Sequence, residues 1–367
     1  MSEAKALTSI AGVGGPQQPL LAVKGVSKHF AAGHGLFSRA RVVRAVDDVS
    51  FSVEKGEVLG IVGESGCGKS TTARLIIGLI SSDAGEITFD GEPVGPTLSL
   101  REVRRRVQMV FQDSYASLNP RLTVEETIAF GPKVHGLAPA EARARSHELL
   151  HKVGLDPAWF ADRYPHELSG GQRQRINIAR ALALAPRLVI LDEAVSALDK
   201  SIEAQVLNLL LDLKREFDLT YIFISHDLNV VRFISDRVIV MYLGEVVESG
   251  PVDTLWADAR HPYTRALLAA MPSLDPEQRT QAAPIIGDPP SPIDPPSGCR
   301  FHTRCAYAEE ICCSRAPRLM SAGNERHSVA CFMAESTSGH SRATGASKSN
   351  RETEDVTDHH RSVLSLS

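Results

Sequence analysis

Residues 58–71 of the chain read VLGIVGESGCGKST, and this stretch decides the fold. Its first half, VLGIVG, is a short apolar run of the kind that forms a buried strand. Its second half, GESGCGKST, fits the pattern G-x-x-x-x-G-K-[ST], a glycine-rich turn between a strand and a helix. Backbone N–H groups in such a turn surround a phosphate chain, so the stretch predicts a phosphate-binding loop. The loop consists of Gly63, Glu64, Ser65, Gly66, Cys67, Gly68, Lys69, Ser70 and Thr71.

Side chains of this loop have distinct predicted roles. Lys69 is expected to reach the outer phosphates, and the Ser70 hydroxyl is expected to bind Mg²⁺. Cys67 is interpreted as a small residue that the loop can accommodate, rather than as a redox thiol.

Further apolar runs, separated by helical patterns, extend this unit into an α/β domain. The runs are LLAV at 20–23, VQMVFQ at 107–112, RLVILD at 187–192, YIFISHD at 221–227 and RVIVMYLG at 237–244. The helical patterns cover 69–80, 138–153, 171–184 and 200–216. This alternation predicts a mostly parallel sheet with helices on both faces. The region of about 115–180 has no convincing strand, and we expect it to be a helical insertion in the α/β core.

Length and composition limit the class of protein. The 367 residues are 43% hydrophobic and have room for one large domain and a smaller one. A formal net charge of −4 gives no reason to expect a nucleic acid partner. No apolar run approaches the roughly 18–20 residues that span a bilayer. Residues 1–19 lack the pattern of a signal peptide and are expected to form a flexible leader. We therefore expect a cytosolic chain that reaches a membrane only through a partner.

Polar residues stand at the ends of several predicted strands. Asp192 ends RLVILD, at the sheet edge where ligands of open α/β sheets bind, and is expected to serve Mg²⁺. Glu193 follows it and is expected to polarise an attacking water. His226 follows the run YIFIS and is placed to contact a γ-phosphate, whereas Gln112 is placed to reach Mg²⁺ or the water.

A second anion site is predicted at residues 168–172, which read LSGGQ and lead into a helix. Free backbone N–H groups, a hydroxyl and the positive end of a helix dipole all favour an anion there. Its residues are Leu168, Ser169, Gly170, Gly171 and Gln172.

With these motifs in this order, residues 20–255 resemble the ATP-binding subunit of an ABC transporter. The resemblance implies a P-loop NTPase with a RecA-like, mostly parallel sheet and an inserted α-helical subdomain. It implies that two subunits pack head to tail, so that LSGGQ acts in trans on ATP held by the partner's P-loop. It also implies that Phe30 stacks on adenine and that Gln112 couples the nucleotide to the membrane partner. The D-loop, which contacts the opposite subunit, consists of Ser196, Ala197, Leu198 and Asp199.

The C-terminal third resembles the extension found in oligopeptide/dipeptide permease ATPases, most closely the F-type subunit. The residues that carry this resemblance are HPYTRALLAAMP at 261–272, a proline-rich linker within 256–297 and a Cys-rich module at 298–334. The segments 31–44 and 114–121 agree with it. Residues 335–367 are almost without apolar side chains and are expected to be disordered.

The resemblance implies a motor that drives the uptake of di- and oligopeptides at the cytoplasmic face of the plasma (inner) membrane. Its implied partners are a second ABC ATPase subunit, alike or related, two integral-membrane permeases and a separate substrate-binding protein. Three alternatives stay open. One is an importer for another cargo, such as nickel, another metal, glutathione or a peptide analogue. Another is a soluble ABC ATPase without a transport role. In the third, the Cys-rich module carries the main function and the ATPase regulates an Fe–S protein.

Four cysteines in the C-terminal module are candidate metal ligands: Cys299, Cys305, Cys312 and Cys331. A cluster of thiols in a cytosolic chain suggests metal before disulfides. The short Cys pairs of structural zinc sites and the spacing of ferredoxins are both absent, so spacing alone selects no metal. The resemblance implies a [4Fe–4S] cluster, as in some members of the permease group. Zinc and unmetallated packing cysteines remain alternatives.

Overall fold

The computed structural model describes residues 15, 18–32, 41–271, 287–324 and 326–343. The leader at 1–14 and 16–17, the segment 33–40, the linker at 272–286 and the tail at 344–367 lie outside the described residues. What the sequence predicts for those segments stays a prediction.

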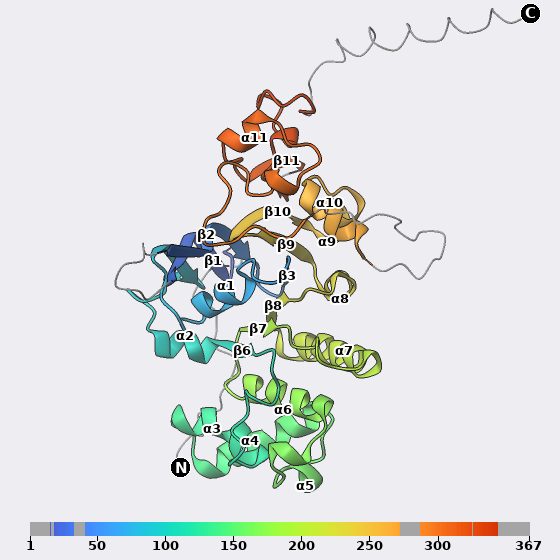
Figure 1. The fold of residues 1–367 in the computed structure, drawn as a ribbon. Coiled ribbons are helices and arrows are strands. Elements are labelled where there is room, and N and C mark those ends of the chain that lie inside the picture. The colour runs from blue at the N-terminus through green and yellow to red at the C-terminus, as the bar shows by residue number, and fades with distance from the viewer. Residues whose placement is uncertain (1–14, 16–17, 33–40, 272–286, 325, 344–367) are drawn as a thin grey trace, which may run out of the picture.

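A mixed sheet forms the centre of the molecule (Figure 1). Within the described residues its strand order is β11-β12-β10-β9-β3-β8-β7-β6, and the five strands from β9 to β6 are parallel. The parallel strands are β3 (Val58–Val62), β6 (Val107–Val110), β7 (Leu188–Asp192), β8 (Thr220–Ile224) and β9 (Arg237–Tyr242). These are the apolar runs that the sequence predicts as strands, so the expected α/β fold is confirmed.

Side chains of the parallel strands alternate between two hydrophobic cores. In β7, Val189 and Leu191 enter one core, whereas Leu188 and Ile190 enter the other. The first core is covered mainly by α6 (Gly170–Leu182), α7 (Lys200–Phe217) and α8 (Leu228–Ile234). The second is covered by α1 (Lys69–Ile76), α2 (Leu100–Arg106) and a separate antiparallel sheet. Burial on both faces explains why these strands are continuously apolar.

The antiparallel sheet is the part of the domain that the sequence analysis misses. Its strand order is β2-β1-β4-β5. Its strands are β1 (Leu21–Ala32), β2 (Arg41–Val53), β4 (Ala84–Phe89) and β5 (Glu92–Pro93). The run at 20–23, which the sequence predicts as a buried strand, leads into β1 of this sheet, where β1 pairs with β2 and β4 in antiparallel register. The helix expected at 69–80 ends at Ile76, and Gly78 follows with a φ of +67°.

Helices fill the chain between β6 and β7 and lie below the sheet in Figure 1. They are α3 (Val124–Val134), α4 (Pro139–Lys152), α5 (Pro157–Phe160), the 3-10 turn η1 (Pro165–Glu167) and α6. Thr123 starts α3 with a capping box, in which its hydroxyl accepts from the Glu126 N–H and its own N–H donates to the Glu126 carboxylate.

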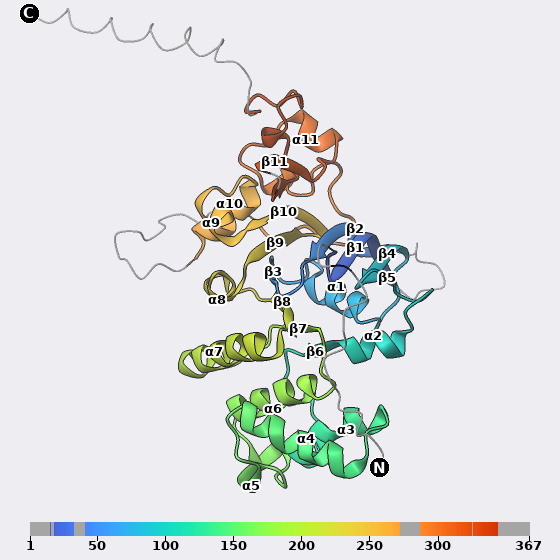
Figure 2. The same cartoon turned by 180° about the vertical axis from the view of Figure 1, so that it is seen from behind.

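The C-terminal region lies at the opposite end of the molecule from α3–α6, as Figures 1 and 2 both show. After β10 (Glu245–Pro251) come α9 (Val252–Ala257) and α10 (Pro262–Ala269). The Cys-rich part contains η3 (His302–Arg304), α11 (Glu310–Ser314), β11 (Met320–Asn324), β12 (His327–Val329) and η4 (Phe332–Ala334). β12 pairs with β10, so this part extends the central sheet.

Two further observations concern residues 335–343 and the helices of the described chain. Residues 335–343, expected to belong to a disordered tail, instead pack against the Cys-rich part: His340 is buried, and its ring contacts the Tyr307 carbonyl at 3.0 Å. In the part of the chain that the structure describes, no helix is both long and apolar enough to cross a bilayer.

Candidate active site

The loop at 63–71 connects β3 to α1, as its sequence predicts. Two of its glycines are required by close backbone approaches. A Cβ at Gly63 would lie 2.2 Å from the Met241 carbonyl oxygen, and one at Gly68 would lie 2.3 Å from the Ala45 carbonyl oxygen. Both glycines also have positive φ values, which larger residues rarely adopt. The loop is therefore held against the chain on two sides, while Ser65 and Gly66 at its tip are exposed.

Lys69 lies folded over this loop. Its side chain is buried, and its Nζ donates to the carbonyl oxygens of Gly63 at 2.7 Å and Glu64 at 2.9 Å. The ammonium thus provides a positive charge inside a ring of backbone groups. Cys67 is buried beneath it, and burial raises the pKa of its thiol, which fits a small packing residue rather than a reactive one.

Ser70 and Asp192 place two oxygen ligands side by side. The Ser70 hydroxyl donates to Asp192 Oδ1 at 2.9 Å, and Asp192 ends β7 in a buried position. Burial raises the pKa of Asp192, although the hydrogen bond from Ser70 opposes the rise. Hydroxyl and carboxylate oxygens are the ligands that Mg²⁺ prefers, so this pair fits the metal that the sequence predicts.

Glu193 is the point at which the predicted strand-end residues meet. Gln112 Nε2 donates to Glu193 Oε2 at 2.7 Å, and His226 Nδ1 lies 3.4 Å from the same oxygen. The backbone of Glu193 has a φ of +49°, a conformation that non-glycine residues adopt mainly where the surroundings impose it. The N–H of Glu193 also donates to the Ile224 carbonyl at 2.9 Å, which fixes its position against β8.

The second predicted anion site lies at the start of α6. Ser169 is the N-cap: its hydroxyl accepts from the Gln172 N–H at 3.3 Å, and its N–H donates to the Gln172 side chain at 2.9 Å. Leu168 is buried, whereas Ser169 is exposed. The D-loop precedes α7, with Ser196, Ala197 and Asp199 exposed and Leu198 half-buried. Figures 1 and 2 both show α6 below β7 and α1 above it.

Phe30 lies near the end of β1, opposite Val43 of β2. Its side chain is 40% exposed, and Lys28 Nζ lies 5.6 Å from the centre of its ring. An exposed aromatic face of this kind is available for stacking on a planar ligand.

Sequence reasoning misses one contact of the phosphate loop, with the C-terminal region. Arg304 makes two hydrogen bonds to the Glu64 carboxylate, at 2.9 and 3.0 Å. The Tyr263 hydroxyl accepts from the Glu64 N–H at 2.8 Å. Tyr263 belongs to the motif HPYT, which carries a family resemblance but predicts no contact, and no local signal pairs Glu64 with a residue 240 positions away.

The four candidate thiols line one small pocket of about 20 Å³. Burial raises the pKa of Cys299 to about 12 and that of Cys331 to about 11, and the neighbouring thiols add to both rises. The structure thus gathers Cys299, Cys305, Cys312 and Cys331 at one place. However, no group of three or more His, Cys, Asp or Glu side chains in the described ranges is arranged to hold a metal ion. The described residues therefore contain no preformed metal centre.

Solved structures share this architecture. The chain superposes on CbiO1 of Clostridium perfringens, part of an ABC transporter complex, with a TM-score of 0.57 and 28% identity, covering 66% of this chain and 92% of that one. It superposes on the ATP-binding cassette MJ0796, a dimer bound to ADP and phosphate, with a TM-score of 0.55 and 31% identity, covering 63% and 98%. The fold and the loop define an ABC-type ATPase, a class that binds ATP with Mg²⁺.

Family and sequence comparisons agree with this class. Residues 46–196 match the ABC transporter family, and residues 247–312 match the oligopeptide/dipeptide transporter C-terminal region. The oligopeptide transport ATP-binding protein AppF of Bacillus subtilis is 50% identical over 324 residues, which cover 86% of this chain and 98% of AppF. OppF of Haemophilus influenzae is 50% identical over 302 residues, covering 81% and 90%. The chain belongs to the ATP-binding subunits of ABC transporters that carry this C-terminal region.

Proposed function

We propose that this chain is the ATP-hydrolysing motor subunit of an ABC importer for di- and oligopeptides. The observation that carries the ATPase is the meeting of Gln112 and His226 on Glu193, next to the Ser70–Asp192 pair and the phosphate loop. The peptide cargo is supported by the C-terminal region and by relatives that are named for oligopeptide transport. Peptide uptake by cells lacking the gene, compared with complemented cells, tests the cargo.

Each residue of the site has a separate proposed role in ATP binding or hydrolysis. Ser70, Asp192 and Gln112 would hold Mg²⁺, which when bound would neutralise charge on the phosphates. Lys69 turns from the loop carbonyls to the outer phosphates. Glu193 accepts hydrogen bonds from groups around it and orients the attacking water, a role typically worth about 10²–10⁴ in rate. His226 contacts the γ-phosphate, and Phe30 stacks on the adenine.

The working unit is a head-to-tail dimer with a like or related ATPase subunit. The exposed Ser169 and the half-buried Gly170 close over the nucleotide in the partner's loop, and the D-loop contacts the partner. ATP then joins two half-sites, and hydrolysis separates them, which is a ligand-driven two-state switch. Two permease subunits hold the dimer at the cytoplasmic face of the membrane, and a separate binding protein delivers the cargo.

Glu193→Gln tests the catalytic assignment. The variant keeps the size of the side chain and its contact with Gln112, but it removes the negative charge that polarises water. We expect ATP binding to persist and turnover to fall by about 10²-fold or more, roughly 2.7 kcal/mol of barrier. Steady-state phosphate release and nucleotide titration on the same preparation separate the two effects. Turnover within threefold of the wild type would show that another group performs this role.

We also propose that the four thiols take up a metal centre, with a [4Fe–4S] cluster as the first candidate. Their donor chemistry and their common pocket support it, and the pocket must widen to admit a cluster. Burial raises the pKa of Cys299 and Cys331, and a thiol must lose its proton to bind a metal, so uptake releases protons. Anaerobically purified protein should be brown, with roughly four irons per chain. Cys305→Ser should bleach it, with Cys313→Ser as the control, because the adjacent Cys313 is exposed and does not line the pocket. One zinc ion per chain would show that the thiols bind a structural zinc instead of a cluster. No metal at all would refute the proposed metal centre.

A further inference from the structure

We propose that Arg304 and Tyr263 are positioning residues that preorganise the phosphate loop of the same chain, acting through Glu64. The proposal rests on the assignment of the loop as the ATP site. It gives the C-terminal region a direct role at the nucleotide, which its place at the end of the sequence does not suggest.

The ion pair between Arg304 and Glu64 is bidentate and largely shielded from water. Nη1 lies 2.9 Å from Glu64 Oε2 and Nη2 lies 3.0 Å from Oε1, and the Arg304 side chain is only 6% exposed. The hydrogen bonds to Glu64 raise the pKa of Arg304 above its ordinary value. A paired guanidinium and carboxylate in this geometry fix orientation as well as distance.

Tyr263 holds the backbone of the same residue. Its hydroxyl accepts from the Glu64 N–H at 2.8 Å, and its ring is fully buried against Tyr242 and Phe301, with ring centres 4.6 and 5.4 Å away. Burial raises the pKa of Tyr263, which keeps the phenol neutral. The Glu64 carbonyl in turn accepts from Lys69 Nζ at 2.9 Å. Glu64 is therefore fixed through its side chain and its N–H, and it contacts the lysine that serves the phosphates.

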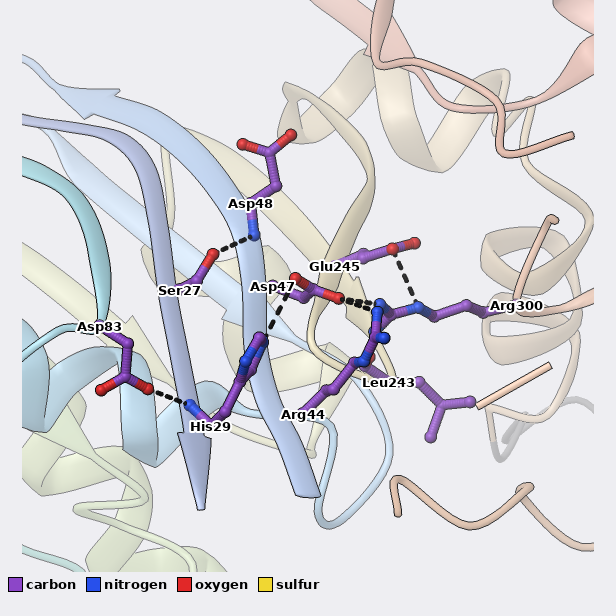
Figure 3. Close-up of polar contacts among 9 residues, drawn as sticks. All are labelled: Ser27, His29, Arg44, Asp47, Asp48, Asp83, Leu243, Glu245 and Arg300. Atoms are coloured by element: carbon purple, nitrogen blue, oxygen red, sulfur yellow. Dashed lines mark hydrogen bonds and ion pairs between the residues drawn. The ribbon is translucent and has the colours of Figure 1, made fainter. Parts of the chain in front are cut away.

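A second ion-pair cluster attaches the same C-terminal part elsewhere, as Figure 3 shows. Arg300 pairs with Asp47 on β2, and its Nε lies 2.9 Å from Glu245 Oε1 on β10. Arg44 and His29 also contact Asp47, at 3.3 and 3.5 Å. Among the described residues, none of these five side chains forms a hydrogen bond or ion pair with the phosphate loop. The nearest link runs through the backbone, because the Asp47 N–H donates to the Gly244 carbonyl and the Gly244 N–H donates to the Cys67 carbonyl, each at 2.9 Å. We therefore assign docking of the C-terminal region to Arg300 and positioning of the phosphate loop to Arg304, four residues further on.

A loop that is already held in its binding conformation loses less conformational entropy when ATP binds, so ordering the loop costs less free energy. Removal of the Arg304 contact should therefore weaken ATP binding while leaving the chemical step nearly unchanged. Removal of the Arg300 contact should loosen the C-terminal region without this effect.

The experiment compares Arg304→Met with Arg300→Met in the full-length chain. Mg·ATP affinity is measured by titration, kcat and KM are measured by phosphate release, and thermal unfolding reports stability. We expect Arg304→Met to raise the Kd and KM for ATP about tenfold with kcat within twofold. Arg300→Met should lower the unfolding temperature but leave the Kd within twofold. Tyr263→Phe should show a smaller rise, and Arg304→Lys, which keeps only the charge, should recover part of the affinity.

The pattern of results decides the proposal. An unchanged Kd in Arg304→Met, or an equal rise in both arginine variants, would reduce Arg304 to a general docking residue. If Arg304→Met fails to fold, Tyr263→Phe and Arg304→Lys carry the comparison, and an unchanged Kd in both overturns the proposal. A wild-type chain that neither binds nor hydrolyses ATP would instead contradict the proposed function.

Discussion

His261 shows how one buried side chain can set the pH dependence of stability. It is the N-cap of α10, where its Nδ1 accepts from the Tyr263 N–H at 3.1 Å, and its own N–H donates to Glu248 at 3.1 Å. Complete burial lowers the pKa of His261 to about 4, although the charge of Glu248 opposes this. A protonated ring would lose the acceptor that caps the helix.

The sign of the effect follows from where protons bind. Between about pH 6.5 and pH 4 the unfolded chain protonates His261 and the folded chain does not, so folding stability falls as the pH falls through this window. The loss is on the order of 3 kcal/mol at its limit. His261→Asn keeps a capping oxygen without the titration. We expect its stability difference from wild type to shrink between pH 7.5 and pH 5, measured by urea unfolding. Parallel pH profiles of the two proteins would contradict this account.

At the scale of elements, α6 shows that the two adjacent glycines of LSGGQ have different duties. A Cβ at Gly171 would lie 2.7 Å from Ile202 Cγ2 on α7, whereas a Cβ at Gly170 would meet only Leu198, at 3.9 Å. Gly171 is thus required for the close packing of α6 on α7. Gly170 has no such constraint in this chain, which leaves it available for a ligand that approaches from outside.

Alanine substitutions at Gly170 and Gly171 should therefore have different effects on stability. Gly171→Ala is expected to destabilise the fold by about 1–3 kcal/mol, because the branched Ile202 side chain must shift. Gly170→Ala should be neutral or slightly stabilising, because alanine favours a helix by about 1 kcal/mol over glycine. Thermal unfolding of both variants measures this. Equal shifts in unfolding temperature would mean that α6 and α7 adjust freely to the added methyl group.

At the scale of the whole molecule, the LSGGQ segment and the C-terminal region lie at opposite ends of the folded chain. The helices α3–α6 carry the LSGGQ segment, in which Ser169 is exposed, at one end, and the C-terminal region extends the sheet at the other, where β12 pairs with β10. The buried pair of His327 and Glu248, 2.8 Å apart, fastens that extension. The helix α6, which follows Ser169, lies on the far side of β7 from α1 in both views, and this arrangement supports the proposal that LSGGQ acts on a nucleotide held by another subunit.

Ser169→Arg tests this geometry. The variant should leave the affinity of the isolated chain for Mg·ATP within twofold, because the phosphate loop supplies that affinity, and it should abolish ATP-dependent dimerisation. Thr123→Arg is the matched control, because it removes an equivalent capping box from α3 outside the signature. Size-exclusion chromatography with light scattering, in the hydrolysis-deficient Glu193→Gln background, measures the dimer. A large loss of ATP affinity in the Ser169→Arg monomer would place LSGGQ on the nucleotide in cis.

The sequence by itself determined the parts of this protein that depend on short-range pattern. The parallel strands are continuous apolar runs, so they and the helices between them could be predicted, and the polar residues that follow them fall at one sheet edge by topology alone. The meeting of Gln112, Glu193 and His226 follows from that rule. The LSGGQ segment could be placed at a helix start because a cap and its partner lie three residues apart.

Only the tertiary structure decided the contacts between distant segments. β2 has too irregular a pattern of buried and exposed residues to be recognised as a strand, and β12 is three residues long, so both form because a partner strand is present. The ion pair of Arg304 and Glu64 joins residues 240 positions apart. Local propensity and hydrophobic period contain no information about such a pair, because it exists only where the folded sheet brings the C-terminal region over the phosphate loop.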